Sequence, residues 1–496
     1  MSKKCCVIGG GLGGLAAAVE VARLGIDVDL YEQNWNTGGK ANTLTFNNFR
    51  FDTGPSLLTM PFVLESIFTD AGKNLKNYLT IKPLEKHCIY FYPDGTIITA
   101  YNDIEKFADE IELKTKDSRK HFFAYLKYCK NIYDLTADFF LFNDFRDFQS
   151  IKRFLSIKTI LNIHKLDSLR SMHRANRSFF RSEKTIQLFD RYATYNGSNP
   201  YKAPATLNII SHVENNIGSF IAEEGIYGIT EALTKLAKES GVRIYYNHKV
   251  QRILRRNREI SGVTVNGENI TYDYIVSNAD ASSTYKELLN DQSTKAARKY
   301  KSLEPSSSAL VFYWGMNNAT NNVGIHNILF SKDYKKEFNE IFSEKICPGD
   351  PTVYIYISSK YKKNDAPSKK ENWYVMINAP YEENQDWEYE IDKSRSAIIQ
   401  KISKTLKISV QSKIICEKTL TPRDIRRMTS GIKGSLYGIS SNTRKAAFLR
   451  QGNKSEYYKG LFFCGGSVHP GGGIPLVLLS GKLAARAIEK EVNKNK

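Results

Sequence analysis

The sequence of 496 residues has no long apolar run. A helix that spans a bilayer needs about 20 consecutive apolar residues, and the stretch IPLVLLSG at 474–481 is far shorter. The first residues place two lysines before an apolar stretch, as a secretory signal does, but five closely spaced glycines interrupt that stretch. We therefore expect a cytoplasmic protein whose contact with a membrane, at the inner face of the cell membrane, is peripheral.

Cysteine is scarce and scattered, with seven residues in the whole chain. Their number is odd, and none of them forms a C-x-x-C motif or a zinc-ligand spacing. This usage favours reduced, buried thiols in the cytoplasm. Internal repeats, low-complexity linkers and clusters of metal-ligating residues are also missing, so we expect no metal centre.

Acidic residues are too few to balance the basic ones, since 52 Asp and Glu stand against 71 Lys and Arg, a formal net charge of +19. This balance indicates an anionic partner, which could be nucleic acid, an acidic membrane surface or an anionic ligand. Charge alone does not distinguish among them. With 41% hydrophobic and 25% charged residues, the chain has the composition of a globular protein and the length for two or more domains.

Glycine is abundant near the start of the chain. KKCCVIG predicts a short buried strand, LGGLAAAVEVARLG a helix that stops at Gly25, and DVDLYE a second strand that ends at Glu32. Between the strands lies the pattern G-x-G-x-x-G, at Gly9, Gly11 and Gly14. A strand, a helix and a second strand around this pattern are typical of a dinucleotide-binding fold.

Each part of the pattern has a physical role in holding a dinucleotide. Gly9 permits a tight turn, Gly11 lets a pyrophosphate approach the backbone, and Gly14 lets helix and strand pack closely. The phosphates then face the positive end of the helix. The carboxylate of Glu32 can accept hydrogen bonds from both ribose hydroxyls and repels the 2′-phosphate of NADP, which argues against that cofactor.

Two further glycine segments bear on the choice between NAD and FAD. NTGGKANT carries Gly39 and Lys40, and RFDTGPS carries Gly54 and Pro55. A nicotinamide-binding domain usually proceeds to its next strand and helix at this point. This chain instead makes a second glycine-bearing crossing, along which a flavin or its ribityl chain could lie. The sequence therefore favours FAD.

The chain resembles a known family. RFDTGPS and the closing LFFCGGSVHPGGGIPLVLLSGKLAA are similar to motifs of the bacterial-type carotenoid desaturases, which include phytoene desaturase and belong to the FAD-dependent amine oxidase superfamily. The resemblance runs from residue 4 to about residue 488. It implies an α/β fold with α+β insertions, in which a Rossmann-type FAD-binding domain is assembled from discontinuous segments. We expect that domain at 1–85, 222–290 and 415–496, and a substrate-binding domain at 86–221 and 291–414 with a helical, membrane-associating part at about 120–185.

The family pattern also implies which residues hold the cofactor. The closing glycines let the backbone approach the flavin, a helix beginning near Ile474 directs its amides at the ring, and the adenine contacts the backbone of Val250. His469 is a candidate for proton transfer or, alternatively, a residue that positions the turn through hydrogen bonds. The expected cofactor-binding residues are Gly9, Gly11, Leu12, Gly13, Gly14, Glu32, Gly39, Lys40, Gly54, Pro55, Val250, Gly465, Gly466 and Ile474.

The insert from Tyr125 to Phe180 mixes aromatic and aliphatic residues with bases. Three interpretations compete: solvated helices that cover the core, an amphipathic surface that docks on anionic lipid, and a nucleic-acid site. The resemblance favours the membrane over nucleic acid, because a carotenoid is too apolar to diffuse through water and has to be drawn from the bilayer. Between 152 and 181 only Asp167 opposes the bases, which are Lys152, Arg153, Lys158, Lys165, Arg170, Arg174, Arg177 and Arg181.

Two stretches point to the reaction. RYATY, from Arg191 to Tyr195, is similar to the subgroup that desaturates the 3,4 bond of hydroxylated or methoxylated carotenoids. Glu223 matches an acid of that subgroup, and Glu224 stands where family members commonly carry glycine. Removal of a hydride leaves an allylic cation, which a nearby carboxylate could stabilise and deprotonate. Alternatively, both acids lie at the surface or at the start of the following helix, whose dipole favours them.

The resemblance thus implies an FAD-dependent carotenoid desaturase of carotenoid biosynthesis, acting on the 3,4 bond of a 1-hydroxycarotenoid. Its candidate catalytic residues are Glu224, Glu223 and His469, and its final electron acceptor is oxygen or a quinone. Alternatives are a phytoene or diapophytoene desaturase and, in another class, an amine oxidase-like flavoprotein.

Overall fold

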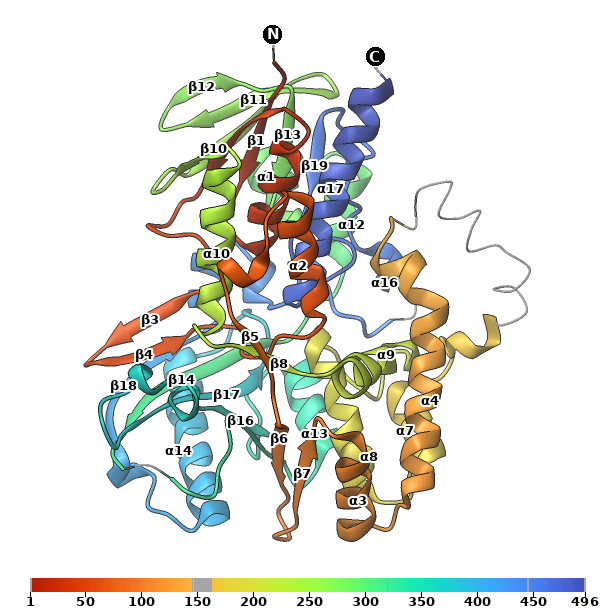
Figure 1. Ribbon diagram of the computed structural model, residues 1–496, viewed down its shortest axis with the longest axis vertical. Helices are drawn as coiled ribbons and strands as arrows, with labels where there is room; N and C mark the ends of the chain where they lie inside the picture. Colours follow the sequence, from red (N-terminus) through yellow and green to blue (C-terminus); the bar gives the residue numbers. More distant parts are fainter. Residues whose placement is uncertain (1, 145, 147–162, 319, 444–445, 495–496) are drawn as a thin grey trace.

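The computed structural model describes residues 2–144, 146, 163–318, 320–443 and 446–494. Two parts are built around different sheets, and a helical region lies beside them (Figure 1). None of the described helices is long and apolar enough to cross a membrane. The seven cysteines are all described, and all are free thiols.

The first part is a parallel sheet of five strands that come from both ends and from the middle of the chain. In spatial order the strands are β19 (Leu461–Phe463), β13 (Tyr274–Ser277), β1 (Lys4–Ile8), β2 (Asp27–Tyr31) and β9 (Arg243–Tyr245). Every neighbouring pair is parallel. The sheet confirms the Rossmann-type fold and its assembly from separated segments.

Alternate residues of β1 face opposite sides of this sheet, as the period of two in a strand requires. Cys5 and Val7 pack against helices, whereas Cys6 and Ile8 pack against a small antiparallel sheet and a further helix. The helices on the first side are α1 (Leu12–Ala22), α2 (Pro61–Asp70), α10 (Ile226–Glu239) and α17 (Ile474–Lys494). The second side is covered by β10 (Val250–Arg256), β11 (Glu259–Val265), β12 (Glu268–Thr271) and α12 (Lys295–Ser302).

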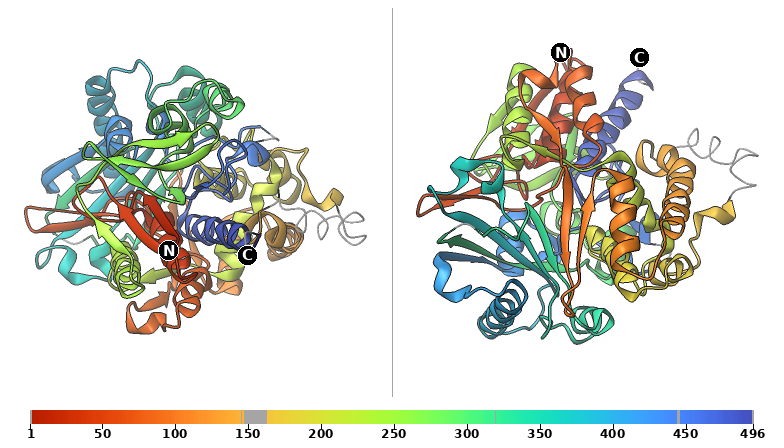
Figure 2. Two further views of the ribbon diagram at one scale, coloured as in Figure 1. Left: turned by 90° about the horizontal axis from the view of Figure 1, so that it is seen from above. Right: turned by 60° about the horizontal axis from the view of Figure 1, so that its bottom comes forward.

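The two ends of the chain meet where α1 contacts α17, and both termini lie at the same end of the molecule (Figure 1 and Figure 2). At Gly481 of α17, an added Cβ would come within 2.5 Å of the Gly13 carbonyl oxygen and 2.7 Å of the Ala17 nitrogen. Glycine inside a helix costs about 1 kcal/mol relative to alanine. At this position glycine lets the two helix backbones approach each other.

The second part is a mixed sheet of seven strands. Their order is β18 (Ile414–Leu420), β14 (Ser308–Met316), β17 (Glu371–Ala379), β16 (Val353–Tyr356), β15 (His326–Leu329), β6 (Lys86–Phe91) and β7 (Ile97–Tyr101). Neighbouring strands are antiparallel except β15 and β6. Strand β14, next to the edge strand β18, is buried along its whole length, so both faces of the sheet are covered there.

The two faces of this sheet contact different neighbours. Leu310, Phe312 and Trp314 of β14 pack with α14 (Trp387–Leu406) in one apolar cluster. The alternate residues Ala309 and Val311 belong to another cluster and line the large cavity described below. The outer face of the sheet thus forms a core, and the inner face forms a wall of the site.

One expected domain boundary is too early. We placed the start of the last FAD-binding segment at residue 415, but β18 pairs with β14 along the edge of the second sheet. The seven residues of β18 carry no sign of which sheet they join, because that choice depends on the partner strand. In the structure residues 414–420 belong to the second part.

The helical region packs next to β6 and β7, and Figure 2 shows its orange and yellow helices beside the second sheet. Phe107, Phe122, Tyr125 and Phe189 form its buried aromatic core. Its helices are α3 (Ile104–Lys114), α4 (Arg119–Thr136), α7 (Met172–Phe179) and α8 (Glu183–Asp190). Part of the expected membrane-associating segment, including Lys152, Arg153 and Lys158, lies outside the described residues.

Shorter elements connect these parts. The strands are β3 (Thr43–Phe46) and β4 (Phe49–Asp52), which form a hairpin, and β5 (Ile81–Pro83) and β8 (Phe220–Ala222), which are distant in the sequence and pair antiparallel. The helices are α9 (Ile209–His212), α11 (Ala281–Ser283), α13 (Tyr334–Asn339), α15 (Pro422–Thr429) and α16 (Ala446–Leu449).

The contact between α1 and α17 makes the first prediction. Gly481→Ala should lower the free energy of unfolding by about 1–3 kcal/mol, because the added methyl group overpacks against the backbone of α1 despite the better helix propensity of alanine. The measurement is denaturant unfolding of the purified protein. Glu489→Ala on the same helix is the control, and a Gly481→Ala variant as stable as that control would contradict a tight contact.

Candidate cofactor and substrate site

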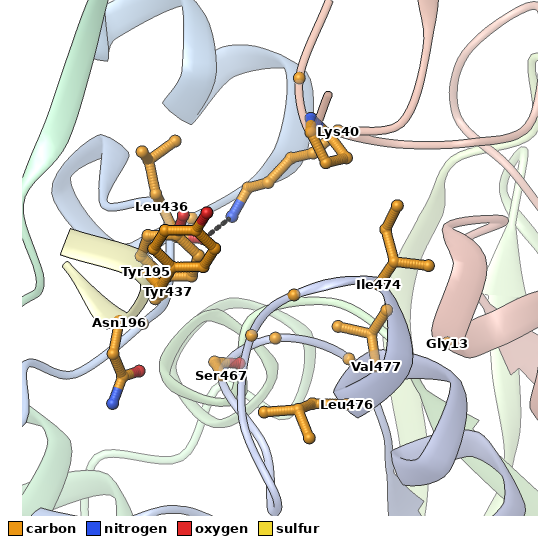
Figure 3. Close-up of a pocket in the computed structure, with 18 of the residues that line it drawn as sticks. Gly13, Lys40, Tyr195, Asn196, Leu436, Tyr437, Ser467, Ile474, Leu476 and Val477 are labelled. Carbon is orange, nitrogen blue, oxygen red and sulfur yellow. Dashed lines mark hydrogen bonds between the residues drawn. The ribbon is translucent and has the colours of Figure 1, made fainter. Parts of the chain in front are cut away.

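One cavity of about 1050 Å³ extends between the two sheets. One end is lined by the glycine segments of the first part, and the other by the inner face of the second sheet and by residues 191–214. Figure 3 shows the middle of this cavity, where the closing segment of the chain, with Ser467, Ile474 and Val477, faces Tyr195 and Asn196. All expected cofactor-binding residues except Gly14 line it.

The first glycine loop has the geometry of a dinucleotide cradle. Gly9 has a φ of 95°, a conformation that favours glycine. A Cβ on Gly14 would lie 2.1 Å from the Gly9 carbonyl oxygen, so this residue serves the close packing of helix and strand. The buried carboxylate of Glu32 accepts hydrogen bonds from the Gly10 nitrogen at 2.8 Å and the Asn34 nitrogen at 2.8 Å, and it lines the cavity.

Asn278, at the end of β13, is the residue around which the glycine segments gather. Its Nδ2 donates to the Gly9 carbonyl oxygen at 3.2 Å. A Cβ on Gly11 would lie 2.7 Å from that Nδ2, and Cβ atoms on Gly13 and Gly465 would lie 2.9 Å and 2.7 Å from its Oδ1. Asn278 is not among the residues that the sequence predicts at the cofactor site. These short distances to Asn278 explain why positions 11, 13 and 465 carry no side chain, and the explanation needs no bound ligand.

Gly466 is different, and it tests whether a cofactor fits. Its φ is not in the left-handed region, and a Cβ there would meet no atom closer than 3.7 Å. Neither backbone strain nor protein packing therefore requires glycine at this lining position. A planar ligand that lay against this backbone would leave no room for a side chain, so glycine here fits a flavin site.

Two basic residues hold the closing segment and its surroundings. Arg450 is buried, and its Nη1 donates to the carbonyl oxygens of Gly466 at 2.8 Å and Tyr437 at 2.9 Å. Lys40 donates from Nζ to the Leu436 carbonyl oxygen at 2.5 Å (Figure 3). Burial lowers the pKa of Lys40 to about 8. Neither the role of Arg450 nor the close approach of the Tyr437 ring to Gly472 has a sequence signal, because each depends on segments that meet only in the fold.

The two candidate acids lie elsewhere. Neither Glu223 nor Glu224 is among the described residues that line the cavity. Glu223 forms an ion pair with Lys82 at 2.5 Å on the surface, and the carboxylate of Glu224 accepts hydrogen bonds from the Thr80 nitrogen. Because β8 pairs with β5, the two acids that follow β8 lie beside the residues next to and within β5. This placement corresponds to the alternative interpretation of surface glutamates.

His469 does line the cavity, and it is buried. Its Nε2 lies 3.0 Å from the Asn143 carbonyl oxygen, which can only accept, so Nε2 carries the hydrogen. Burial lowers the pKa of His469 to about 4, so the ring is neutral near pH 7. The hydrogen bond ties the closing turn to the end of the helical region, as expected for a residue that positions the turn.

The comparisons with known proteins agree with this geometry. Residues 12–489 match the family described as flavin containing amine oxidoreductase. The chain belongs to this family. The finding confirms the resemblance noted in the sequence, and the protein is an FAD-dependent oxidoreductase.

Two relatives of this flavin family are similar over almost their whole length. A 1-hydroxycarotenoid 3,4-desaturase from Flavobacterium sp. (strain P99-3) is 39% identical over 489 residues, which cover 98% of this chain and 99% of the relative. A 4,4′-diaponeurosporene oxygenase from Staphylococcus haemolyticus (strain JCSC1435) is 34% identical, with 98% and 97% covered. Carotenoid-modifying enzymes are thus among the relatives of the chain.

Solved structures of flavin-family members share the fold. An oxidoreductase from Methanosarcina mazei matches with a TM-score of 0.64 and 16% identity over 98% of this chain and 100% of its own. A putrescine oxidase bound to putrescine matches with a TM-score of 0.64 and 11% identity, with 99% of each chain covered. At such identities the likeness concerns the fold alone.

The neutral His469 predicts a dependence of stability on pH. Between about pH 4 and pH 6.5 the unfolded chain binds a proton at this residue and the folded chain does not, so stability falls as the pH is lowered through that window. From pH 7 to pH 5 the free energy of unfolding of the wild type should therefore decrease. In His469→Gln this decrease should be smaller by about 2 kcal/mol, because the variant lacks the titrating imidazole. Denaturant unfolding at the two pH values measures this difference, and equal drops in the two proteins would contradict a buried neutral imidazole.

Proposed function

We propose that the protein is a carotenoid desaturase that forms the 3,4 double bond of a 1-hydroxycarotenoid in carotenoid biosynthesis. The observation that carries the proposal is the continuity of the cavity, in which the cradle for FAD opens directly into an apolar slot. The full-length similarity to a 1-hydroxycarotenoid 3,4-desaturase supports the choice of substrate and bond.

The cofactor end would hold FAD through residues of three segments. Glu32 would face the adenosine ribose, the N-terminal end of α1 at Leu12 and Gly13 the pyrophosphate, and the backbone of Val250 the adenine. Gly54 and Gly466 would let the flavin ring lie against backbone. Bound FAD supplies the acceptor for the hydride that leaves the substrate.

The slot would align the carbon chain and exclude water. Its walls include Val311 and Met376 of the second sheet and Ile209, Ile210 and Val213 on the opposite side. Apolar walls of this kind bind a linear polyene by burial of its surface and leave no water near the reacting carbons. A desaturation removes a hydride from one carbon and a proton from its neighbour, and the electrons leave the enzyme to oxygen or a quinone.

The test is a reaction with purified, FAD-loaded protein and liposomes that contain a 1-hydroxylated linear carotenoid. We expect a product lighter by two hydrogens and an absorbance shifted to longer wavelength, because the conjugated system lengthens. Phytoene, a C30 carotenoid and putrescine are supplied in parallel. Turnover of putrescine alone would favour an amine oxidase, and oxygen insertion into the C30 chain an oxygenase. Anaerobic reactions with and without a quinone identify the electron acceptor.

The proposal includes docking on the membrane, from which an apolar substrate has to come. Phe62, Leu169 and Phe448 are exposed by 42%, 71% and 53%. The ring of Phe448 lies 5.5 Å from that of Phe140, and both residues line the cavity. Lys165 and Arg170 are exposed in the same region of the chain as Leu169. Exposed apolar side chains with basic residues in the same region suit the headgroup boundary of an anionic membrane, although Arg170 also pairs with Asp167 at 2.6 Å.

Flotation with liposomes tests this docking. Phe448→Glu and Phe62→Glu should each lower the fraction of protein that floats with vesicles containing an anionic phospholipid by about tenfold, because a carboxylate replaces a ring that would insert into the membrane. Ile415→Glu, at an exposed apolar position on β18, is the matched control. Wild-type protein that stays with the unbound fraction, or an equal loss in the control, would contradict the proposed surface.

A further inference from the structure

A charged cluster interrupts the apolar wall of the slot. Arg191 and Glu214, both buried, form an ion pair at 2.8 Å, and both line the cavity. Burying two charges costs several kcal/mol per ion unless hydrogen bonds compensate. A cavity meant only for hydrocarbon has no use for such a pair.

The carboxylate of Glu214 accepts hydrogen bonds from three protein donors. Its Oε1 accepts from Arg191 Nη2 and from the Tyr192 hydroxyl, each at 2.8 Å, and its Oε2 accepts from the Tyr195 hydroxyl. The nearby Arg191 pulls the pKa of Glu214 down against the effect of burial, so the group is ionised. The hydroxyl of Tyr195 therefore donates its hydrogen to Glu214, and its oxygen can accept hydrogen bonds from other groups.

Arg191 is less completely occupied. Its Nε and Nη2 donate to the Tyr90 hydroxyl, and Nη2 also donates to Glu214. For the two hydrogens of Nη1, the described part of the chain offers one acceptor, the Tyr195 hydroxyl at 3.4 Å. Arg191 Nη1 thus has a hydrogen to donate, next to a Tyr195 oxygen that can accept.

This donor and acceptor lie one short helical segment from the cofactor end. Arg191 and Tyr195 belong to the 3-10 helix Arg191–Asn196. The next residues contact Tyr437 and Arg450: a Cβ on Gly197 would lie 2.9 Å from the ring of Tyr437, and Arg450 Nη2 donates to Asn196 Oδ1 at 3.5 Å. Arg450 in turn donates to the Gly466 carbonyl oxygen of the closing segment. Figure 3 shows Tyr195 and Asn196 on the cavity wall.

Two buried histidines keep the surroundings of the pair polar. His87 and His326 line the cavity near the ion pair, and Glu214 influences the pKa of each. Burial lowers the pKa of both, to about 3 for His326, so the rings are neutral. Within the described residues, His87 Nδ1 and His326 Nε2 have no hydrogen-bond partner. This end of the slot therefore offers more hydrogen-bonding capacity than the protein itself uses.

We propose that Arg191 Nη1 and Tyr195 Oη together bind the hydroxyl group at the end of the substrate and so select a hydroxylated carotenoid. This inference rests on the proposed function. A hydroxyl both accepts and donates one hydrogen bond, which matches a donor beside an acceptor. In a 1-hydroxylated chain that reacts at carbons 3 and 4, the hydroxyl is two carbons from the reacting bond, so its binding site has to lie next to the flavin. A chain without the hydroxyl leaves the Arg191 hydrogen unpaired in a dry slot, which is how polar sites reject apolar analogues.

The experiment compares three linear carotenoids of equal length, with a terminal hydroxyl, a terminal ketone or no oxygen, in liposomes with FAD-loaded protein. Wild type should prefer the hydroxylated chain. Tyr195→Phe removes the acceptor, so kcat/KM for the hydroxylated chain should fall about tenfold relative to the chain without oxygen. The ketone cannot donate to Tyr195, so its rate should fall no more than that of the chain without oxygen.

Tyr192→Phe is the matched control, because Tyr192 also donates to Glu214 but does not line the cavity among the described residues. It should change kcat/KM for all three chains by one common factor. A selectivity unchanged in Tyr195→Phe, or changed equally in Tyr192→Phe, would overturn the assignment.

The equilibrium binding of the three carotenoids, measured by flavin fluorescence, separates the hydroxyl-binding site from the proposed desaturase function. Selective binding without turnover refutes the desaturase and keeps the hydroxyl site, whereas turnover without selectivity does the opposite.

Discussion

The structure depends on the close packing of three backbone segments around one amide side chain, that of Asn278. The first glycine loop, the end of β13 and the closing segment meet there, and side chains at Gly11, Gly13 or Gly465 would collide with it. The amide is bonded to the Gly9 carbonyl oxygen, which fixes the loop at the edge of the sheet. Because these segments come from the beginning, middle and end of the chain, the cradle forms only when the fold is complete.

The same convergence creates the site from two sheets. The parallel sheet contributes the polar, glycine-lined end, and the inner face of the mixed sheet contributes the apolar end. Side chains along β14 alternate between the two faces of the mixed sheet. One set forms a core with α14, and the other set faces the slot. A cofactor and an apolar chain can thus share one continuous cavity.

The charge cluster at Arg191 and Glu214 shows how selectivity and stability oppose each other in such a space. An ion pair buried in an apolar wall contributes little to folding, because desolvation offsets most of the attraction. The tyrosines around it supply the hydrogen bonds that make the burial tolerable. A ligand would form hydrogen bonds with the donor on Arg191 and the acceptor on Tyr195 that the protein does not use. The buried ion pair adds little to stability, so ligand binding explains it best.

The sequence by itself determined the dinucleotide fold, because Gly9, Gly11, Gly14 and Glu32 stand at spacings that local geometry dictates. The resemblance to the family also predicted that the closing motif lies at the cofactor. It could not determine where Glu223 and Glu224 point, since that depends on the pairing of β8 with β5, nor that β18 joins the second sheet. Only the tertiary structure decided that Asn278 lies among the glycines and that Arg191 meets Glu214, because contacts between residues distant in the sequence depend on packing and leave no periodic trace along the chain.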